Sequence, residues 1–212
     1  MGRTELIEEM HRRRLVAVVR SKTAAEALET AAAVAEAGVK FVEITFSVPG
    51  AVGVIEELGK RSDLHVGAGT VLSADEAQQA ITAGAQFIVS PTLELNLVPF
   101  CRGADVACIS GAATPSEIVC AVRAGADLVK IFPADCVGGP HFVRQMLGPF
   151  PDVRLMVSGG VNEDNVQEYV KLGVTGIALA SASLRDVLVK AGREGLAKHV
   201  SKFVKLVEEA QR

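Results

Sequence analysis

Short apolar runs alternate with Ala-rich amphipathic segments along nearly the whole chain, and this alternation constrains the fold more than any other feature. Eight runs have the length and composition of β-strands: Leu15–Val19, Phe41–Phe46, His65–Gly69, Phe87–Ser90, Val106–Ile109, Leu128–Phe132, Arg154–Val157 and Gly176–Ala180. The helices predicted between them include Ala24–Ala37, Val52–Gly59, Ala74–Ala83, Pro115–Ala124, His141–Leu147 and Glu163–Leu172. Strands that are apolar throughout are typical of sheets covered on both faces. The pattern predicts an α/β protein, a single (β/α)8 TIM barrel domain over residues 1–212, with a doubly wound open sheet as the competing architecture.

The two ends of the chain are predicted to be helices that complete this barrel. Leu6, Ile7 and Met10 would share one face of a short N-terminal capping helix. Residues Lys198–Arg212 have the amphipathic pattern of a helix that closes the barrel. Its face toward the barrel would carry Val200, Phe203, Val204 and Val207. Three internal helices have N-cap signals, namely Ser73 with Glu76, Thr114 before Pro115, and Asn162 before Glu163.

Composition narrows the class of function. The formal net charge is −3, and the chain has no tryptophan and one tyrosine, which disfavours nucleic-acid binding by bulk charge or by base stacking. No apolar run approaches the roughly 18 residues of a membrane span, and the N-terminus lacks the apolar core of a signal peptide. The four cysteines and four histidines show no metal-ligand spacing. We therefore expect a cytoplasmic protein with buried free thiols and no bound metal.

A helix-to-strand signal recurs before every second strand. Its glycines, which suit the left-handed conformation that ends a helix, are Gly38, Gly84, Gly125 and, more weakly, Gly173. The residues five positions after these glycines are Glu43, Val89, Lys130 and Ala178. Alternate strands of a (β/α)8 barrel fill one interior layer together. The spacing therefore predicts that Glu43 and Lys130 face each other inside the barrel.

A lysine and a glutamate inside a barrel indicate chemistry, because strand interiors rarely hold either residue unpaired. Burial disfavours the ammonium form, so an enclosed Lys130 would be available as a neutral amine that attacks a ketone to form a Schiff base. Glu43 would then move protons between water, the carbinolamine and the enamine carbon. This chemistry needs no cofactor. The alternative is a structural salt bridge, which is a poor source of stability because desolvation offsets the attraction.

Other candidate residues follow the strands, where barrel enzymes bind their substrates. Thr70 follows the Gly67-Ala68-Gly69 run, whose glycines would permit close ligand approach, and Pro91 follows the fourth strand. Backbone N–H groups after the seventh and eighth strands commonly bind phosphate in this fold. There the sequence places Ser158, Gly159, Gly160 and Ser181. Arg20, after the first strand, could pair with a substrate carboxylate or phosphate, or form a surface ion pair.

Several of these segments together resemble a known family. They are Val42-Glu43-Ile44-Thr45-Phe46, Gly67-Ala68-Gly69-Thr70-Val71, Phe87-Ile88-Val89-Ser90-Pro91, Val129-Lys130-Ile131-Phe132-Pro133-Ala134 and Ser158-Gly159-Gly160-Val161. In this order they resemble the class I 2-keto-3-deoxy-6-phosphogluconate / 4-hydroxy-2-oxoglutarate aldolases from about Leu15 to the C-terminal helix. The resemblance implies cleavage of 2-keto-3-deoxy-6-phosphogluconate to pyruvate and glyceraldehyde 3-phosphate, without a cofactor, by a homotrimer.

The resemblance also implies roles for individual residues. Lys130 matches the Schiff-base lysine and Glu43 the general acid/base, while Thr70 matches the threonine near the pyruvyl carboxylate and Thr45 belongs to the same substrate-binding set. Pro91 and Phe132 match residues that wall the pyruvate pocket. The match to the phosphate-binding loops consists of Ser158, Gly159, Gly160 and Ser181.

Three positions depart from the family pattern. Ser47 stands where many members carry an arginine for the substrate carboxylate, so that this group would rest on Thr70, Arg20 and backbone amides. The usual Pro-Thr-Gly-Gly is Val157-Ser158-Gly159-Gly160, which keeps the hydroxyl. The usual Gly-Ser after the eighth strand is Ala180-Ser181, whose added methyl could crowd a phosphate.

The sequence leaves other functions open. The substrate could be 4-hydroxy-2-oxoglutarate or 2-keto-3-deoxy-6-phosphogalactonate. A phosphate-binding isomerase or decarboxylase barrel would need an Asp/Lys network or a Cys/Asp pair at the strand ends, and the sequence offers neither. A non-catalytic barrel that binds a phosphorylated ligand would use Glu43 and Lys130 as a structural pair only.

Overall fold

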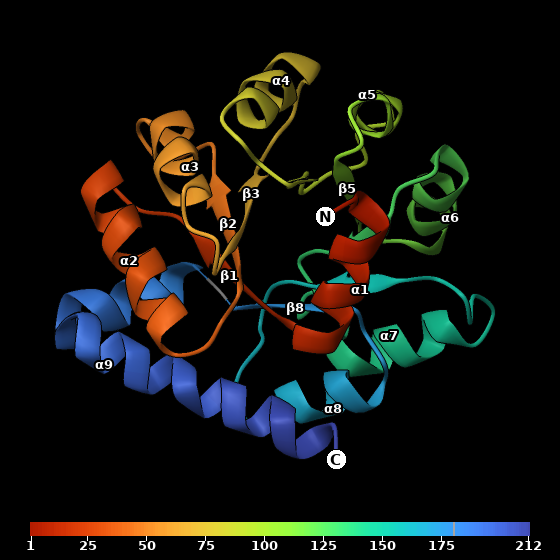
Figure 1. Cartoon of the computed structure of the whole chain (residues 1–212). Helices are drawn as coiled ribbons and strands as arrows, with labels where there is room; N and C mark the ends of the chain where they lie inside the picture. The colour runs from red at the N-terminus through yellow and green to blue at the C-terminus, as the bar shows by residue number, and fades with distance from the viewer. Residues whose placement is uncertain (180) are drawn as a thin grey trace.

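Eight parallel strands close into a barrel that is surrounded by helices in the computed structural model of the chain (Figure 1). The structure describes residues 1–179 and 181–212, and of Ser181 the backbone alone. The strands are β1 Leu15–Val19, β2 Phe41–Thr45, β3 His65–Gly69, β4 Phe87–Val89, β5 Ala107–Ala112, β6 Leu128–Ile131, β7 Leu155–Val157 and β8 Gly176–Leu179. Each strand pairs with the next, and β8 closes on β1 with Ile177 opposite Leu15. The prediction of a (β/α)8 barrel is confirmed, and the open sheet is wrong.

Helices follow the strands and form the outer ring seen in Figure 1. Their bounds are α1 Arg3–Arg13, α2 Ala24–Glu36, α3 Ala51–Gly59, α4 Ala74–Thr82, α5 Leu97–Gly103, α6 Pro115–Ala124, α7 Gly139–Leu147, α8 Val166–Lys171 and α9 Ser181–Ala210. Most agree with the predicted segments to within two residues. The sequence analysis did not predict α5, a short helix that contains Pro99. The predicted start of α8 is wrong, because Asn162 Oδ1 accepts hydrogen bonds from the Asp164 and Asn165 amides in a turn before the helix.

The local signals at the other helix ends are confirmed. The side chains of Ser73 and Thr114 each accept a hydrogen bond from the amide three residues on, at 3.2 and 3.3 Å. The recurrent glycines that end α2, α4, α6 and α8 all have positive φ, between 77° and 98°; they are Gly38, Gly84, Gly125 and Gly173. Only glycine adopts this conformation without strain. These positions therefore fix where each helix turns back into the next strand.

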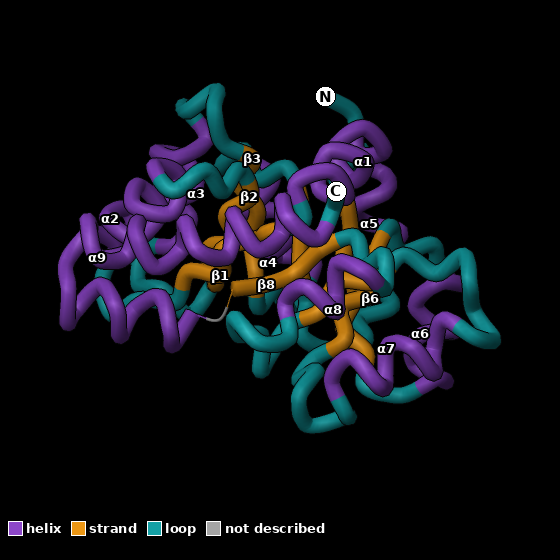
Figure 2. The backbone as a smooth tube through the Cα atoms, turned by 90° about the horizontal axis from the view of Figure 1, so that it is seen from below, coloured by secondary structure: helices purple, strands orange, loops and turns teal. Residues whose placement is uncertain are grey.

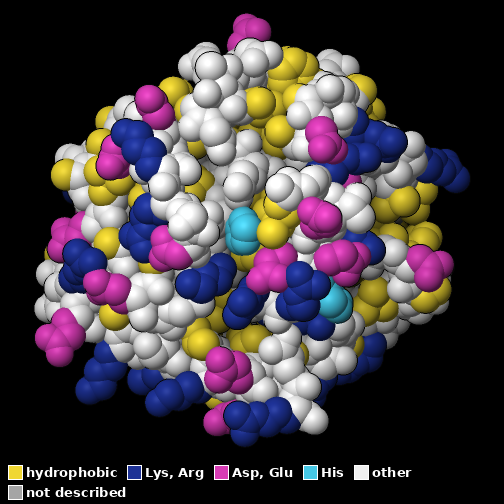
Figure 3. Space-filling model, in the orientation of Figure 1, with side chains coloured by type: hydrophobic (Ala, Val, Ile, Leu, Met, Phe, Trp, Pro, Cys, Tyr) yellow, Lys and Arg dark blue, Asp and Glu magenta, His cyan; other side chains and the backbone are white. Residues whose placement is uncertain are grey.

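Helix α1 closes the amino-terminal end of the barrel, which faces the viewer in Figure 1 and lies along the upper edge of Figure 2. Its buried residues Leu6, Ile7 and Met10 pack with the apolar side chains that fill the barrel interior. Acidic and basic side chains are interspersed over this end of the molecule (Figure 3). Two of the pairs join α1 to other elements, Arg3 with Asp127 at 2.8 Å and Arg154 with Glu8 at 2.6 Å. The capping helix is thus held by both packing and charge.

Helix α9 covers the outside of the barrel beside α2 and α8, as Figures 1 and 2 both show. Its path is interrupted at Gly192, whose φ of 65° and ψ of −173° are not helical. The predicted inner face of its second half is confirmed, since Val200, Phe203 and Val207 are buried and Val204 is partly buried. Among the described helices, none has a stretch long and apolar enough to cross a membrane. The prediction of buried thiols holds for Cys101 and Cys108 and is wrong for Cys120 and Cys136, which are exposed.

Candidate active site

Glu43 and Lys130 face each other inside the barrel. Glu43 lies on β2 and Lys130 on β6, and their side chains are 1% and 6% exposed. Lys130 Nζ lies 3.4 Å from Glu43 Oε1 and 3.5 Å from Oε2, so that it donates to both carboxyl oxygens. A carboxylate and an amine this close in a dry interior can exchange a proton directly or through one water.

Apolar side chains fill the barrel interior around the pair, in a cluster that extends to Leu6, Ile7 and Met10 of α1. The interior cluster includes Val89, Leu128 and Ala178 from the even-numbered strands, and Ile109 and Met156 from the odd-numbered strands. At the other end, the ring of Phe132 lies 5.6 Å from Lys130 Nζ and is 37% exposed. Lys130 is therefore closed off from the amino-terminal end of the barrel, and a substrate can reach it only from the carboxyl ends of the strands.

The glycines of β3 make room for protein side chains. A Cβ added at Gly69 would lie 2.6 Å from Glu43 Cδ, and one at Gly67 would lie 2.5 Å from Phe87 Cζ. Both distances are far below van der Waals contact. The expectation that these two glycines permit close ligand approach is thus corrected, because Glu43 and Phe87 occupy that space. Gly69 lets the Glu43 side chain lie across the barrel toward Lys130.

Thr70 and Arg20 meet at the carboxyl ends of β3 and β1. Arg20 Nη2 donates a hydrogen bond of 3.3 Å to Thr70 Oγ1, and Arg20 is exposed. Thr70 has a φ of 57°, a left-handed conformation that is uncommon for residues other than glycine. Such conformations cost free energy and concentrate at functional sites. The two side chains together offer a hydroxyl and a guanidinium to an anion.

Thr45 and Pro91 take structural positions beside the site. Thr45 is fully buried, donates to the Val19 carbonyl at 3.2 Å and shares a 2.8 Å hydrogen bond with the Ser47 hydroxyl. The segment from Pro91 to Thr92 folds over β5, since a Cβ at Gly111 would lie 2.6 Å from Thr92 N. Gly111, over which the Pro91–Thr92 backbone lies, pairs with Lys130 across β5 and β6.

The turn from Ser158 to Gly160 follows β7. Ser158 is buried and its amide donates to the Ile131 carbonyl at 3.0 Å, so that the turn is attached to the end of β6. Gly159 and Gly160 both have positive φ, of 100° and 68°. Ala180 and the side chain of Ser181, expected to complete a phosphate site, lie outside the described residues.

Sequence analysis missed one residue that the structure places at this turn. Asp135 follows Lys130 by five positions, and its carboxyl group lies against Gly159 and Gly160. A Cβ at Gly159 would lie 3.0 Å from Asp135 Oδ1, and one at Gly160 would lie 2.8 Å from Asp135 Cγ. The sequence signal that could have identified Asp135 is its position as an acidic residue directly after the Lys130–Ala134 segment.

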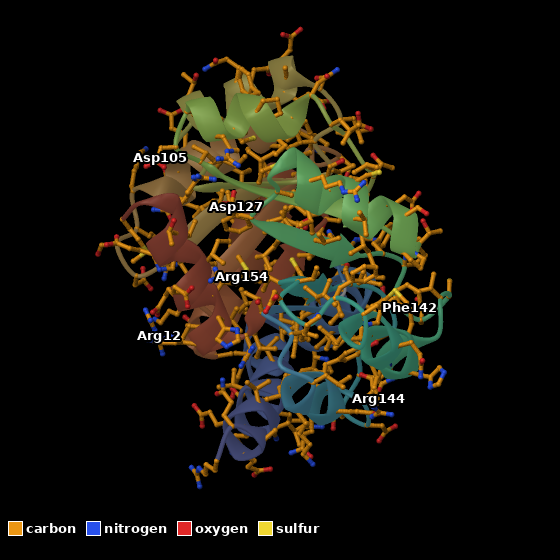
Figure 4. The ribbon with its side chains drawn as sticks, turned by 90° about the vertical axis from the view of Figure 1, so that its right-hand side faces the viewer. Arg12, Asp105, Asp127, Phe142, Arg144 and Arg154 are labelled. Atoms are coloured by element: carbon orange, nitrogen blue, oxygen red, sulfur yellow. The ribbon has the colours of Figure 1, made fainter. Side chains whose placement is uncertain are left out.

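No metal centre emerges from the geometry of the described residues, where no three His, Cys, Asp or Glu side chains gather closely enough to hold an ion. The side view in Figure 4 shows the charged groups Arg12, Asp105, Asp127 and Arg154 toward the α1 end and Phe142 at the opposite end. The groups gathered at the carboxyl ends of the strands are an amine, a carboxylate, hydroxyls and a guanidinium.

Comparison with known proteins decides the family. The model of the KDPG and KHG aldolase family matches residues 6–193. The chain belongs to this family. It is therefore a carbon–carbon lyase of the aldolase type, the class to which relatives named 2-dehydro-3-deoxy-phosphogluconate aldolase belong.

Curated relatives and solved structures agree with the family match. The chain is 36% identical to the 2-dehydro-3-deoxy-phosphogluconate aldolase of Treponema pallidum, over 78% of this chain and 79% of the relative. It is 30% identical to the 2-dehydro-3-deoxy-6-phosphogalactonate aldolase of Escherichia coli, over 92% and 95% of the two chains. The crystal structure of KDPG aldolase from Legionella pneumophila, with pyruvate captured as a covalent carbinolamine intermediate, superposes with a TM-score of 0.82 at 26% identity, over 91% and 94% of the chains.

Proposed function

We propose that this aldolase cleaves 2-keto-3-deoxy-6-phosphogluconate to pyruvate and glyceraldehyde 3-phosphate through a Schiff base on Lys130. The observation that carries the proposal is the buried pair itself, with Lys130 Nζ 3.4 Å from Glu43 Oε1 inside the barrel. A purely structural ion pair in this position would contribute little, since its desolvation offsets its attraction. The covalent carbinolamine reported for the Legionella pneumophila aldolase is the first intermediate that such a lysine would form.

The proposed reaction begins with addition of the neutral Lys130 amine to the C2 ketone. Glu43 supplies and removes the protons with which the carbinolamine loses water and becomes an iminium ion. Glu43 then removes the proton of the C4 hydroxyl, the C3–C4 bond breaks, and its electron pair moves into the enamine while the aldehyde leaves. Protonation of the enamine at C3 and hydrolysis of the imine release pyruvate and restore the lysine.

The remaining residues are assigned by position. Thr70 and Arg20, joined by their 3.3 Å hydrogen bond, would hold the substrate carboxylate in place of the arginine that Ser47 replaces, and the buried Thr45 supports this edge. Pro91 and Phe132 would wall the pyruvyl group. The Ser158–Gly160 turn, with Ser181, would take the phosphate. We further propose, from the family resemblance, that the enzyme is a cytoplasmic homotrimer that needs no cofactor.

The related 6-phosphogalactonate substrate is the second candidate, because the Escherichia coli relative named for it covers 92% of this chain. The two substrates differ at one hydroxyl. Comparing kcat/KM for the two phosphorylated acids and for 4-hydroxy-2-oxoglutarate assigns the preference.

Borohydride reduction in the presence of pyruvate tests the proposed mechanism. The wild-type chain is expected to gain the mass of one reduced pyruvyl group. The Lys130→Met variant, which keeps an unbranched side chain of similar size, should gain none. Lys40, which lies at the opposite end of the barrel, provides the matched control, and Lys40→Met should be trapped as the wild type is. An unmodified wild type, under conditions that trap a known Schiff-base aldolase, would rule the mechanism out.

A further inference from the structure

A peptide group, rather than a side chain, fills one interior position near the carboxyl ends of the strands. On β5, Ile109 belongs to the interior cluster, so the alternation along the strand turns Gly111 inward as well. Gly111 pairs with Lys130 across β5 and β6. A Cβ at Gly111 would meet the Pro91 carbonyl group and would lie 2.6 Å from Thr92 N. The Pro91–Thr92 peptide therefore takes the place of a side chain at the interior position of β5 that pairs with Lys130.

Thr92 holds this peptide through its backbone and its side chain. Its carbonyl accepts a 3.1 Å hydrogen bond from the Gly111 amide, and its amide donates a 3.2 Å hydrogen bond to Ser90 Oγ. Thr92 Oγ1 donates to Glu94 Oε1 at 2.9 Å, because a carboxylate can only accept. The same oxygen then accepts from the Ser90 hydroxyl at 3.2 Å. The Thr92 hydroxyl thus links the buried end of β4, where Ser90 is 2% exposed, to a charged group on the following loop.

We propose that Thr92 is a positioning residue, whose hydroxyl keeps the Pro91–Thr92 peptide on the interior face of Gly111 and so fixes one wall of the pyruvyl subsite. This role rests on the proposed function, in which Pro91 walls the pyruvyl group and Lys130 binds it. Without the hydroxyl, the peptide keeps its backbone contacts and loses its link to Glu94, a charge-assisted hydrogen bond. The wall then moves more freely, and the pyruvyl group binds less tightly.

Borohydride trapping at a series of pyruvate concentrations tests the pyruvyl subsite alone. Thr92→Val keeps the shape of the side chain and removes the hydroxyl. The pyruvate concentration that gives half the maximal initial rate of trapping should rise by about fivefold, the equivalent of one hydrogen bond of ordinary strength. KM for the aldol substrate should rise by the same factor, with kcat nearly constant. Partial unfolding would instead lower the amount of enzyme trapped and kcat, and would leave the half-maximal concentration and KM in place.

Two further variants test the hydroxyl and its acceptor. Thr92→Ser keeps the hydroxyl and should restore the half-maximal concentration of the wild type. Glu94→Ala removes the acceptor and should shift this concentration in the same direction as Thr92→Val. The double variant should be no worse than Thr92→Val alone, because both changes break the same hydrogen bond.

Thr82→Val is the matched control. Thr82 is exposed on the last turn of α4, at the amino-terminal end of the barrel, and its hydroxyl accepts a 3.1 Å hydrogen bond from Gln78 Nε2. The variant makes the same chemical change away from the site and should leave the half-maximal pyruvate concentration unchanged.

A half-maximal concentration in Thr92→Val within about twofold of wild type overturns the inference. An equal shift in Thr92→Ser or in Thr82→Val overturns it as well. If the wild type is trapped and Thr92→Val behaves like it, this inference alone fails. If the wild type is not trapped under conditions that trap a known Schiff-base aldolase, the proposed function fails too.

Discussion

Replacing Gly69 with alanine tests whether the Glu43 carboxyl must keep its place beside Lys130. The new methyl group would lie 2.6 Å from both Cγ and Cδ of Glu43, whereas ordinary contact begins at 3.4 Å. The glutamate side chain must therefore retreat by about 0.8 Å or more, in a core that relaxes only partly. A displacement of this size in a catalytic group costs about a hundredfold in rate. We expect kcat for cleavage to fall by about that factor.

Pyruvate release, coupled to lactate dehydrogenase, measures this loss, and thermal unfolding measures the accompanying strain. Overpacking at Gly69 should lower the free energy of unfolding by about 1–3 kcal/mol, which leaves the barrel folded at 25 °C. Gly53→Ala is the matched control, because Gly53 is exposed on α3 with no atom within 4 Å of an added Cβ. It should retain full activity and gain about 0.5–1 kcal/mol of stability from its helical backbone.

A folded Gly69→Ala variant with wild-type kcat would refute the reasoning. It would mean that the position of the Glu43 carboxyl is unimportant for the reaction, and that Glu43 is not the acid/base. Glu43→Gln tests the acid/base role of Glu43 independently, and kcat should fall by about 10²–10⁴-fold.

Three further predictions concern single residues. Arg20→Met should raise KM for the keto acid by about tenfold in steady-state kinetics, because a charge-assisted hydrogen bond to the substrate is lost. Arg12→Met, at the opposite end of the barrel, should leave KM unchanged. Burial lowers the pKa of His11 below its unfolded value near 6.5, so as the pH falls below that value the unfolded chain takes up a proton that the folded chain does not. The free energy of unfolding of the wild type should therefore fall between about pH 8 and about pH 5.5, and urea unfolding should show a smaller fall in His11→Gln. Thr114→Ala should lower the free energy of unfolding by about 1 kcal/mol, measured by urea titration, because Thr114 caps α6, and unchanged stability would refute the cap's importance.

The barrel could be predicted from the sequence because its signals are local and repeated. The glycines at the ends of α2, α4, α6 and α8 require positive φ, which few other residues tolerate, and each marks the turn from a helix into the next strand. Helix α5 escaped prediction because it is short and contains Pro99, a residue that usually argues against a helix. Asn162 was misread as a helix cap because an Asx turn uses the same side-chain bond.

The candidate site was predictable where it depends on spacing along equivalent strands. Glu43 and Lys130 have equal offsets from equivalent glycines, and barrel geometry turns that equality into a shared interior layer. Contacts between loops have no such rule. The approach of Asp135 to Gly159 and Gly160 joins segments after two different strands, and no periodicity in the sequence reports it. The sequence also does not report that the Glu43 side chain fills the space beside Gly69, so this space was predicted to admit a ligand.

A crystal structure of the enzyme soaked in pyruvate tests the central claim most directly. The account predicts continuous electron density from Lys130 Nζ to C2 of pyruvate, with Glu43 at hydrogen-bond distance from the adduct and the pyruvyl carboxylate between Thr70 and Arg20. Pyruvate bound without a covalent link to Lys130, or attached to another lysine, would contradict it.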